Sequence, residues 1–158
     1  MRLRVLALGL ALAPGMALAA GADWRGHVNS RFGVSVEYPS VFTKRDPPPE
    51  NGDGEVFRTT SGDASLRVYG SYNVDSLSAV KLMGSYQEAG TIYSYSKATR
   101  SWFVLSSAKG GKISYVRCAL GGSDVVGCFE LEYPASDSAQ WSSMVDRVSR
   151  SLRVGGAD

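Results

Sequence analysis

Side-chain oxygens gather in the stretch Asn51-Gly52-Asp53-Gly54, which follows a run of three prolines. Calcium loops use oxygens at alternate positions, but an EF-hand loop that began at Asn51 would place Gly62 where its bidentate glutamate is needed. An irregular calcium site that also uses Asp63 is the alternative. The Asn-Gly and Asp-Gly pairs suit a bend equally well, because glycine tolerates positive φ and Asn and Asp accept local backbone hydrogen bonds. We interpret this loop as architecture first and as a ligand site second.

Few residues could carry out acid–base chemistry. His27 is the only histidine, and the sequence has no Gly-x-Ser-x-Gly motif, so we expect His27 to be exposed or partly packed. Glu130 and Glu132 alternate on one predicted strand about 7 Å apart and could serve glycoside hydrolysis, although such a pair is usually a solvated surface. One histidine and two cysteines are too few for a transition-metal site. We expect no catalytic residue, no metal and no cofactor.

Aromatic side chains are the remaining candidates for a binding surface. Tyr69 and Tyr72 lie three positions apart, and Trp102 begins a later predicted strand. Tyr93 and Tyr95 alternate and are expected on one strand face. Most of these rings should be core, but those on an open sheet could bind a sugar, a peptide or a partner protein. The candidate ligand-binding residues are Asn51, Asp53, Tyr69, Tyr72 and Trp102.

The N-terminal segment has the form of a secretory signal peptide. Two arginines precede an apolar run over 5–18, and small residues lead to a cleavage site after Ala19. The run is too short for a comfortable membrane span. We expect residues 1–19 to be removed, with cleavage one or three residues later as the alternative. Residues 20–158 should then form one exported domain, periplasmic or secreted, without stable membrane insertion.

Removal of the signal leaves a chain without excess charge. The full sequence has 17 basic and 15 acidic residues, and the loss of Arg2 and Arg4 leaves 15 of each. A nucleic-acid binder usually carries a strongly basic patch. We therefore expect no nucleic-acid partner, which leaves an envelope protein or a glycan as the partner to look for.

Cys118 and Cys128 predict a disulfide, because paired cysteines in an exported protein are normally oxidised. The flanking sequences alternate like strands around a turn centred on Ser123, and the two cysteines are equidistant from it. The same register pairs Tyr115 with Leu131 and places the bridge on the more polar face, outside the main core. A redox pair is the alternative, but the Cys-x-x-Cys spacing is absent.

Hydrophobic periodicity predicts an α+β fold, a mainly antiparallel sheet packed by two amphipathic helices. Short connections favour antiparallel over parallel pairing. Strands are expected within 31–42, 55–60, 64–70, 91–98, 101–108, 112–120 and 125–133, helices within 74–90 and 136–153, and a loop over 43–54.

The stretches HVNSRFGVSVEYPSVF and PPPENGDGEVF, followed by ASLRVYGSYN, resemble small exported bacterial proteins of unknown role. The SWFVLSS strand and the C-terminal SLR helix fit the same pattern, and the order of elements resembles the PsbP-like fold. The resemblance covers roughly residues 24–153 and implies an α/β/α sandwich. An extrinsic photosystem II protein and a Ran-binding import factor share that fold, but their functions do not carry over, because none of their binding motifs is visible here.

These observations predict a small exported, non-catalytic binding or accessory protein of the bacterial cell envelope, with an unidentified ligand. A periplasmic hydrolase that uses carboxylates is the alternative. If there is a ligand site, we expect it where the aromatic surface meets the loop from Asn51 to Glu55.

Overall fold

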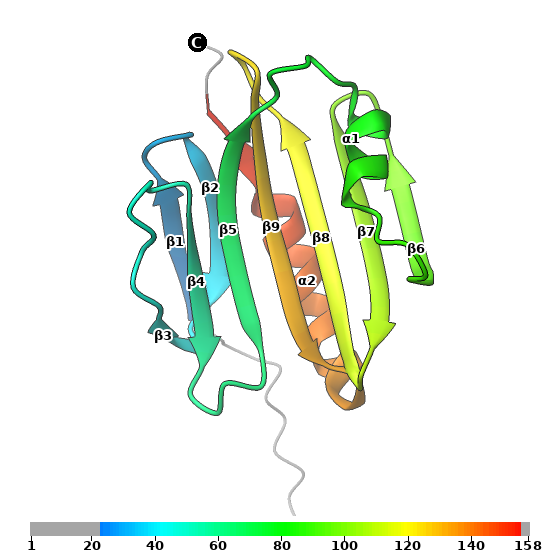
Figure 1. The fold of residues 1–158 in the computed structure, drawn as a ribbon. Helices are drawn as coiled ribbons and strands as arrows, with labels where there is room; N and C mark the ends of the chain where they lie inside the picture. The colour runs from blue at the N-terminus through cyan, green and yellow to red at the C-terminus, as the bar shows by residue number, and fades with distance from the viewer. Residues whose placement is uncertain (1–22, 156–158) are drawn as a thin grey trace, which may run out of the picture.

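The structure, a computed structural model, describes residues 23–155, so the predicted signal peptide lies outside the described residues. The chain forms two antiparallel sheets and two α-helices (Figure 1). The strands are β1 (Trp24–Asn29), β2 (Val34–Pro39), β3 (Phe42–Arg45), β4 (Gly54–Thr59), β5 (Ser65–Tyr72), β6 (Tyr93–Ala98), β7 (Trp102–Lys109), β8 (Lys112–Leu120), β9 (Val125–Pro134) and β10 (Arg153–Val154). The helices are α1 (Ala79–Tyr86) and α2 (Ser138–Ser151), which follows a short 3-10 turn, η1 (Ala135–Asp137).

The main sheet has seven strands in the order β3-β4-β5-β9-β8-β7-β6, and a small sheet has the order β1-β2-β10. Helix α1 lies in front of the main sheet in Figure 1, whereas α2 lies behind it. Every strand pair is antiparallel. The predicted α+β class, the antiparallel sheet and the sandwich of helices are confirmed.

The local strand predictions are confirmed where the pattern is strong, but the N-terminal part of the chain differs from the prediction. The 54–72 hairpin and the β6–β9 meander form as expected. The predicted loop over 43–54 begins with strand β3, which pairs with β4. Strand β1 was not predicted, and β2 belongs to the small sheet with β1 and β10 rather than to the main sheet.

The larger hydrophobic core lies between the main sheet, α2 and the small sheet. Helix α2 buries the apolar stripe predicted for it, with Trp141 6% exposed and Val148 fully buried. The small sheet comes close because β5 and β9 pair Gly70 with Gly127. A Cβ atom at Gly70 would lie 2.4 Å from Phe32 Cβ, so only glycine leaves room for the incoming ring.

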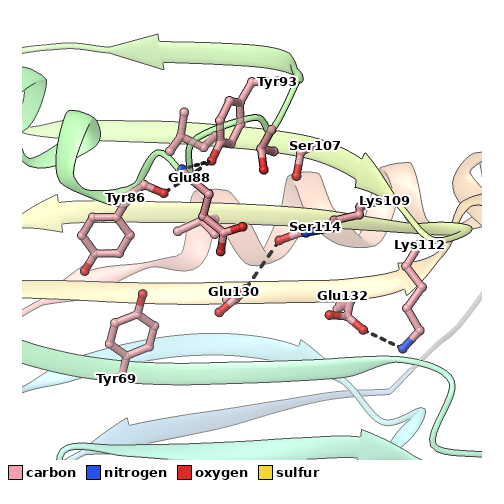
Figure 2. Close-up of a pocket in the computed structure, with 13 residues that line it drawn as sticks. Tyr69, Tyr86, Glu88, Tyr93, Ser107, Lys109, Lys112, Ser114, Glu130 and Glu132 are labelled. Atoms are coloured by element: carbon pink, nitrogen blue, oxygen red, sulfur yellow. Dashed lines mark hydrogen bonds and ion pairs between the residues drawn. The ribbon is translucent and has the colours of Figure 1, made fainter.

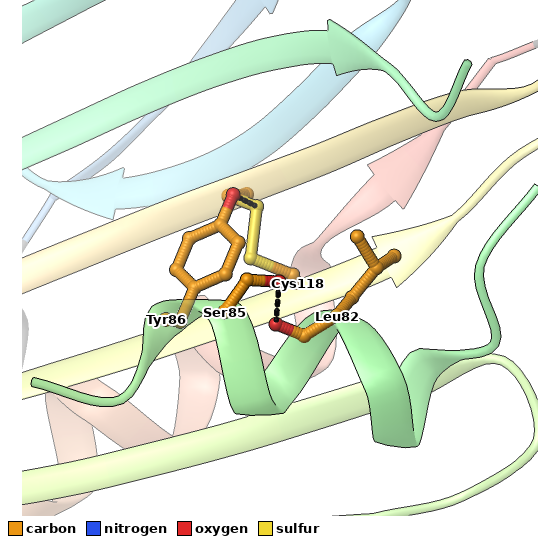
Figure 3. The surroundings of a disulfide bond; sticks show 5 residues. Leu82, Ser85, Tyr86 and Cys118 are labelled. Carbon is orange, nitrogen blue, oxygen red and sulfur yellow. Dashed lines mark hydrogen bonds between the residues drawn. A yellow bond between two sulfur atoms is a disulfide. The ribbon is translucent and has the colours of Figure 1, made fainter. Parts of the chain in front are cut away.

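The second core lies on the opposite face, under α1. Cys118 and Cys128 are directly opposite on β8 and β9 and form the predicted disulfide, with Cα atoms 4.1 Å apart. The bridge occupies the predicted face, but it is buried rather than a staple outside the core: Leu82 and Tyr86 of α1 cover it (Figure 3). The helix is shorter than predicted and begins after Ser78, whose hydroxyl accepts a hydrogen bond from the Lys81 amide.

Within residues 23–155, no helix is both long and apolar enough to span a membrane.

Candidate functional site

The Asn51–Gly54 loop is held by hydrogen bonds to the turn between β1 and β2. Asn29 Nδ2 donates to the Gly52 carbonyl at 2.9 Å, and the Arg31 guanidinium donates to the Asn51 carbonyl. The side-chain amide of Asn51 donates from Nδ2 to Asp53 Oδ2 at 2.7 Å, so the two side chains are hydrogen-bonded to each other. Gly52 has φ 63°, the left-handed conformation that favours glycine. These contacts support the interpretation of the loop as a bend.

Gly54 needs to be glycine for a different reason from the one the sequence suggested. It is already part of β4 and does not adopt positive φ. A Cβ atom there would lie 2.7 Å from Tyr69 Cβ and 3.0 Å from the Val68 carbonyl oxygen. Close approach of β5, rather than turn geometry, therefore excludes a side chain at Gly54.

The structure separates the three aromatic candidates. Tyr69 pairs with Cys128 and faces α1, whereas Tyr72 lies on the other face of the sheet and packs edge-on against Phe32. Trp102 also lies on that other face, where Arg117 stacks over its ring at 4.5 Å. Only Tyr69 therefore faces α1.

The predicted alternation of Tyr93 and Tyr95 on one face is wrong. A register irregularity in β6 pairs Tyr93 with Ser107 and Tyr95 with Ser106, which are neighbours with opposite orientations. Tyr93 consequently turns towards α1, and Tyr95 turns away from it.

A cleft of 520 Å³ opens where α1 ends, on the face of the main sheet that Tyr69 shares. Helix α1 covers only one part of this face, so the strands beside it stay open (Figure 1). Figure 2 shows side chains that converge on the cleft from α1, the loop after it and β5 to β9. Its lining combines aromatic, hydroxyl and charged groups: Tyr69, Tyr86, Glu88, Thr91, Tyr93, Leu105, Ser107, Lys109, Lys112, Ser114, Val116, Glu130 and Glu132.

Three carboxylates line this cleft, including the predicted pair Glu130 and Glu132. Lys112 Nζ donates to Glu132 Oε1 at 2.6 Å, which neutralises one of them. Glu130 accepts a hydrogen bond from the Ser114 hydroxyl at 3.5 Å. Glu88 is tied by its backbone amide, which donates to the Tyr93 hydroxyl at 2.9 Å, and its carboxylate points into the cleft (Figure 2). Glu88 and Glu130 can therefore accept further hydrogen bonds from a ligand.

Tyr69 and Tyr86, at the α1 end of the cleft, keep their hydroxyl protons and can donate hydrogen bonds. Burial raises the pKa of Tyr69 far above its usual range, and the neighbouring Tyr86 hydroxyl and Glu130 raise it further. Burial likewise raises the pKa of Tyr86, whose hydroxyl also lies 3.5 Å from Cys128 Sγ. The two hydroxyl groups point towards one another (Figure 2).

Asp53 and Tyr69 do lie together, in a second hollow of 400 Å³ beside the Asn51–Gly54 loop. Of the five predicted site residues, these two are brought to one place. Asn51 contacts Asp53 but is not part of the lining. Tyr86, Glu88 and Ser114 also line the cleft but were not predicted. Tyr86 lies within the amphipathic helix predicted over 74–90, and helical periodicity alone gives no sign that a ring there will line a cleft.

His27 lies in a separate cluster, between the small sheet and β4. Its side chain is 9% exposed, and Nδ1 lies 3.5 Å from Glu55 Oε2, while Arg45 pairs with the other oxygen of Glu55. His27 Nε2 is buried without a hydrogen-bond partner, and the ring packs edge-on against Phe57. Burial lowers the pKa of His27, outweighing the opposite effect of Glu55, and nearby Arg45 lowers it further. The prediction of a partly packed histidine is confirmed.

Among residues 23–155, no group of three or more His, Cys, Asp or Glu side chains could hold a metal ion.

Solved structures of two proteins resemble this chain along most of its length. The solution structure of cyanobacterial PsbP (CyanoP) from Synechocystis has a TM-score of 0.61 and 16% identity, and the match covers 90% of this chain and 99% of that one. The crystal structure of the Ran-binding protein Mog1p from Saccharomyces cerevisiae has a TM-score of 0.53 and 12% identity, covering 85% and 96%. No protein-family model matches the sequence, and no curated protein does. At these identities the likeness concerns the fold, which is PsbP-like.

Proposed function

We propose that this chain is a small exported protein that binds a glycan of the cell envelope, without chemistry of its own, in the cleft beside α1. One observation carries the proposal: a 520 Å³ cleft on an open sheet face combines three tyrosines with hydroxyl and carboxylate groups. Sugars present apolar C–H faces and many hydroxyl groups. Aromatic rings suit the former, and carboxylates accept strong hydrogen bonds from the latter.

The position of the cleft favours a glycan over a peptide. Peptides commonly add a strand to a sheet edge or lay an apolar helix face in a hydrophobic groove. The cleft lies on the face of paired strands, and polar groups make up most of its lining. It offers neither a free edge nor a deep apolar pocket.

A binding role rather than a catalytic one is supported by the positions of the histidine and the two cysteines. His27 is on the opposite side of the main sheet, beside Glu55, and both cysteines are bridged. Mog1p, which has the same kind of fold, is described as a Ran-binding protein, so this fold can serve for binding.

Calorimetric titration of residues 20–158 with β-1,4-linked oligomers of glucose and of N-acetylglucosamine tests the proposal. We expect binding that Glu130→Gln weakens about tenfold or more, because a hydrogen bond to a charged group contributes roughly 1.5–3 kcal/mol. Asp75→Asn is the matched control, since Asp75 is exposed and lies outside the cleft. Equal affinity of the two variants, or no binding of any oligomer, would refute the proposal.

A carboxylate-dependent hydrolase is the second candidate, because Glu88, Glu130 and Glu132 line the same cleft (Figure 2). Retaining and inverting glycosidases both place two carboxylates around the bond they cleave. Incubation with the same oligomers and mass spectrometry of the products tests this candidate. Shorter oligomers that appear with the native chain and not with Glu130→Gln would establish hydrolysis.

Export of the chain as one α+β domain over 20–158 is part of the same proposal. The apolar run over 5–18 and the small residues up to Ala19 support it, and a disulfide suits an oxidising compartment. N-terminal sequencing of the protein recovered outside the cytoplasm should begin at Ala20. A chain that keeps Met1 and stays with the cytoplasm would contradict export.

A further inference from the structure

The second hollow beside the Asn51–Gly54 loop adjoins the cleft. Tyr69 lines both spaces, and Arg67 in the second hollow lies directly opposite Glu130 in the cleft. Both face the side of the main sheet that carries α1. The two hollows of 520 and 400 Å³ thus meet at β5, with the Tyr69 side chain between them.

The combined depression crosses the strands rather than following one. Its lining runs from Val56 on β4, through β5, β9 and β8, to Ser107 on β7. Neighbouring strands lie about 4.8 Å apart, so these four spacings amount to about 19 Å. A ligand that contacted both ends would have to be a linear chain of several units.

The second hollow has the same mixture of groups as the cleft. Pro47, Pro49 and Val56 give it apolar surface, and Asp46, Asp53 and Arg67 give it charge. Asp46 is already paired, since Arg58 Nη2 lies 2.9 Å from Asp46 Oδ2. Within the described residues Arg67 makes no ion pair, and its side chain is exposed. Arg67 therefore has donors free for sugar oxygens.

We infer that the cleft and the second hollow form one groove for a linear oligosaccharide, with Tyr69 at its middle and Arg67 as a residue that selects for chain length. This inference rests on the proposed function and extends it from a single cleft to an elongated site. A short sugar fills the cleft alone. A longer one passes Tyr69 and gains the contacts of Arg67 and of the two prolines.

A peptide strand does not suit this groove. The backbone of β5, at its centre, is hydrogen-bonded to β4 on one side and to β9 on the other. An extended peptide would therefore find no free backbone groups to pair with, and it would leave its own groups unsatisfied against the sheet face. A glycan needs only side-chain partners, which this face supplies.

The experiment compares a dimer and a hexamer of β-1,4-linked N-acetylglucosamine by calorimetric titration of residues 20–158. We expect the hexamer to bind at least tenfold more tightly than the dimer. Arg67→Ala should weaken the hexamer about tenfold and leave the dimer unchanged, whereas Glu130→Gln should weaken both. Arg100→Ala is the control, because Arg100 is an exposed arginine outside both hollows.

The outcomes separate this inference from the proposed function. If both lengths bind equally and Arg67→Ala changes neither, the extended groove is wrong while the cleft stands. If Arg67→Ala weakens both lengths alike, Arg67 does not select for length, and the inference fails. If neither oligosaccharide binds, both proposals fail. Binding of hexalysine in that case would indicate a peptide-binding site instead.

Discussion

The absence of a Cβ atom at Gly54 allows β4 and β5 to approach closely at this position. Replacement by valine would place Cβ 2.7 Å from Tyr69 Cβ, and that contact lies within paired backbone that cannot easily move. We expect Gly54→Val to lower the free energy of unfolding by about 1–3 kcal/mol, as overpacking does. Urea denaturation measures the change. Gly26→Val is the control, because a Cβ at Gly26 would meet no atom within 4 Å, and its midpoint should barely move.

His27 should make stability depend on pH below neutrality. Burial lowers its pKa in the folded state, so the unfolded chain, with an ordinary pKa of about 6.5, binds the proton more readily. Well above pH 6.5 His27 is neutral in both states, so it does not make the free energy of unfolding depend on pH there. As the pH falls through about 6.5 towards the folded-state pKa, protonation favours the unfolded chain, and stability is lost.

The charged groups that face His27 are Glu55 and Arg45, and both stay in place in a His27→Gln variant. We expect the native chain to lose more stability than this variant when urea denaturation is repeated at pH 7.5 and then at pH 5. Carboxylates that titrate in both proteins cancel in the comparison. Parallel losses in the two proteins would show that His27 is not the group responsible.

At the scale of elements, helix α2 depends on Trp141 for its attachment to the main sheet. The indole stacks on Tyr133 with ring centroids 5.3 Å apart and meets Phe42 at 5.7 Å. We expect Trp141→Ala to lower the free energy of unfolding by about 3–5 kcal/mol, as for other buried large aromatics. Gln140→Ala, one residue earlier on the exposed side, should change it by less than about 0.5 kcal/mol. Similar denaturation midpoints for the two variants would mean that α2 is not docked in this way.

The disulfide links the two strands of the β8–β9 hairpin, and α1 packs directly on it. Replacing both cysteines by alanine should lower the free energy of unfolding by about 2–3 kcal/mol through the entropy of a short loop, without loss of the fold. The amides of α1 should then exchange faster with deuterium than those of α2, because only α1 covers the bridge. Uniform exchange changes in both helices would contradict this local role. Free thiols in the unreduced native protein, detected by alkylation and mass spectrometry, would refute the bridge itself.

The predictable elements are those whose residues alternate between apolar and polar and whose turns carry a clear signal. The β8–β9 hairpin was predictable to the residue, because its turn and the cysteine pair together fix one register. Strand β1 was not predictable, since WRGHVN lacks alternating apolar residues and three of its six residues are exposed. Strand β3 was missed for a similar reason: only Phe42 of its four residues is buried.

At the scale of the whole molecule, the cleft was beyond prediction for a different reason. Its walls come from β5, the end of α1 and the β6–β9 meander, and their meeting depends on the strand order of the main sheet. From the sequence, Glu130 and Glu132 were candidates for a catalytic pair, and Tyr69 was a candidate for ligand binding. The sequence could not show that α1 stops short of them, because the predicted helix ran to Gly90 and the real one ends at Tyr86.

The whole fold depends on the last twenty or so described residues. Helix α2 supplies four members of the larger core, Trp141, Met144, Val145 and Val148, and Leu152 just after the helix supplies a fifth. We expect a chain of residues 20–137 to lose its cooperative urea transition and its near-ultraviolet circular dichroism. The control chain 20–155 should keep both. A cooperative transition in the shorter chain would show that the strands fold alone.

Besides β1, strand β2 has partners from the far end of the chain. The Glu37 amide donates to Ser151 Oγ across 114 positions of sequence, and Arg147 pairs with the Glu37 carboxylate. Strand β10 then closes the small sheet against Val34 and Ser35. During synthesis β2 can pair with β1 early, but it gains these C-terminal contacts only when almost the entire polypeptide has left the ribosome. For the export proposed above, this late closure means that the fold can be completed only after residues 147–154 have crossed the membrane.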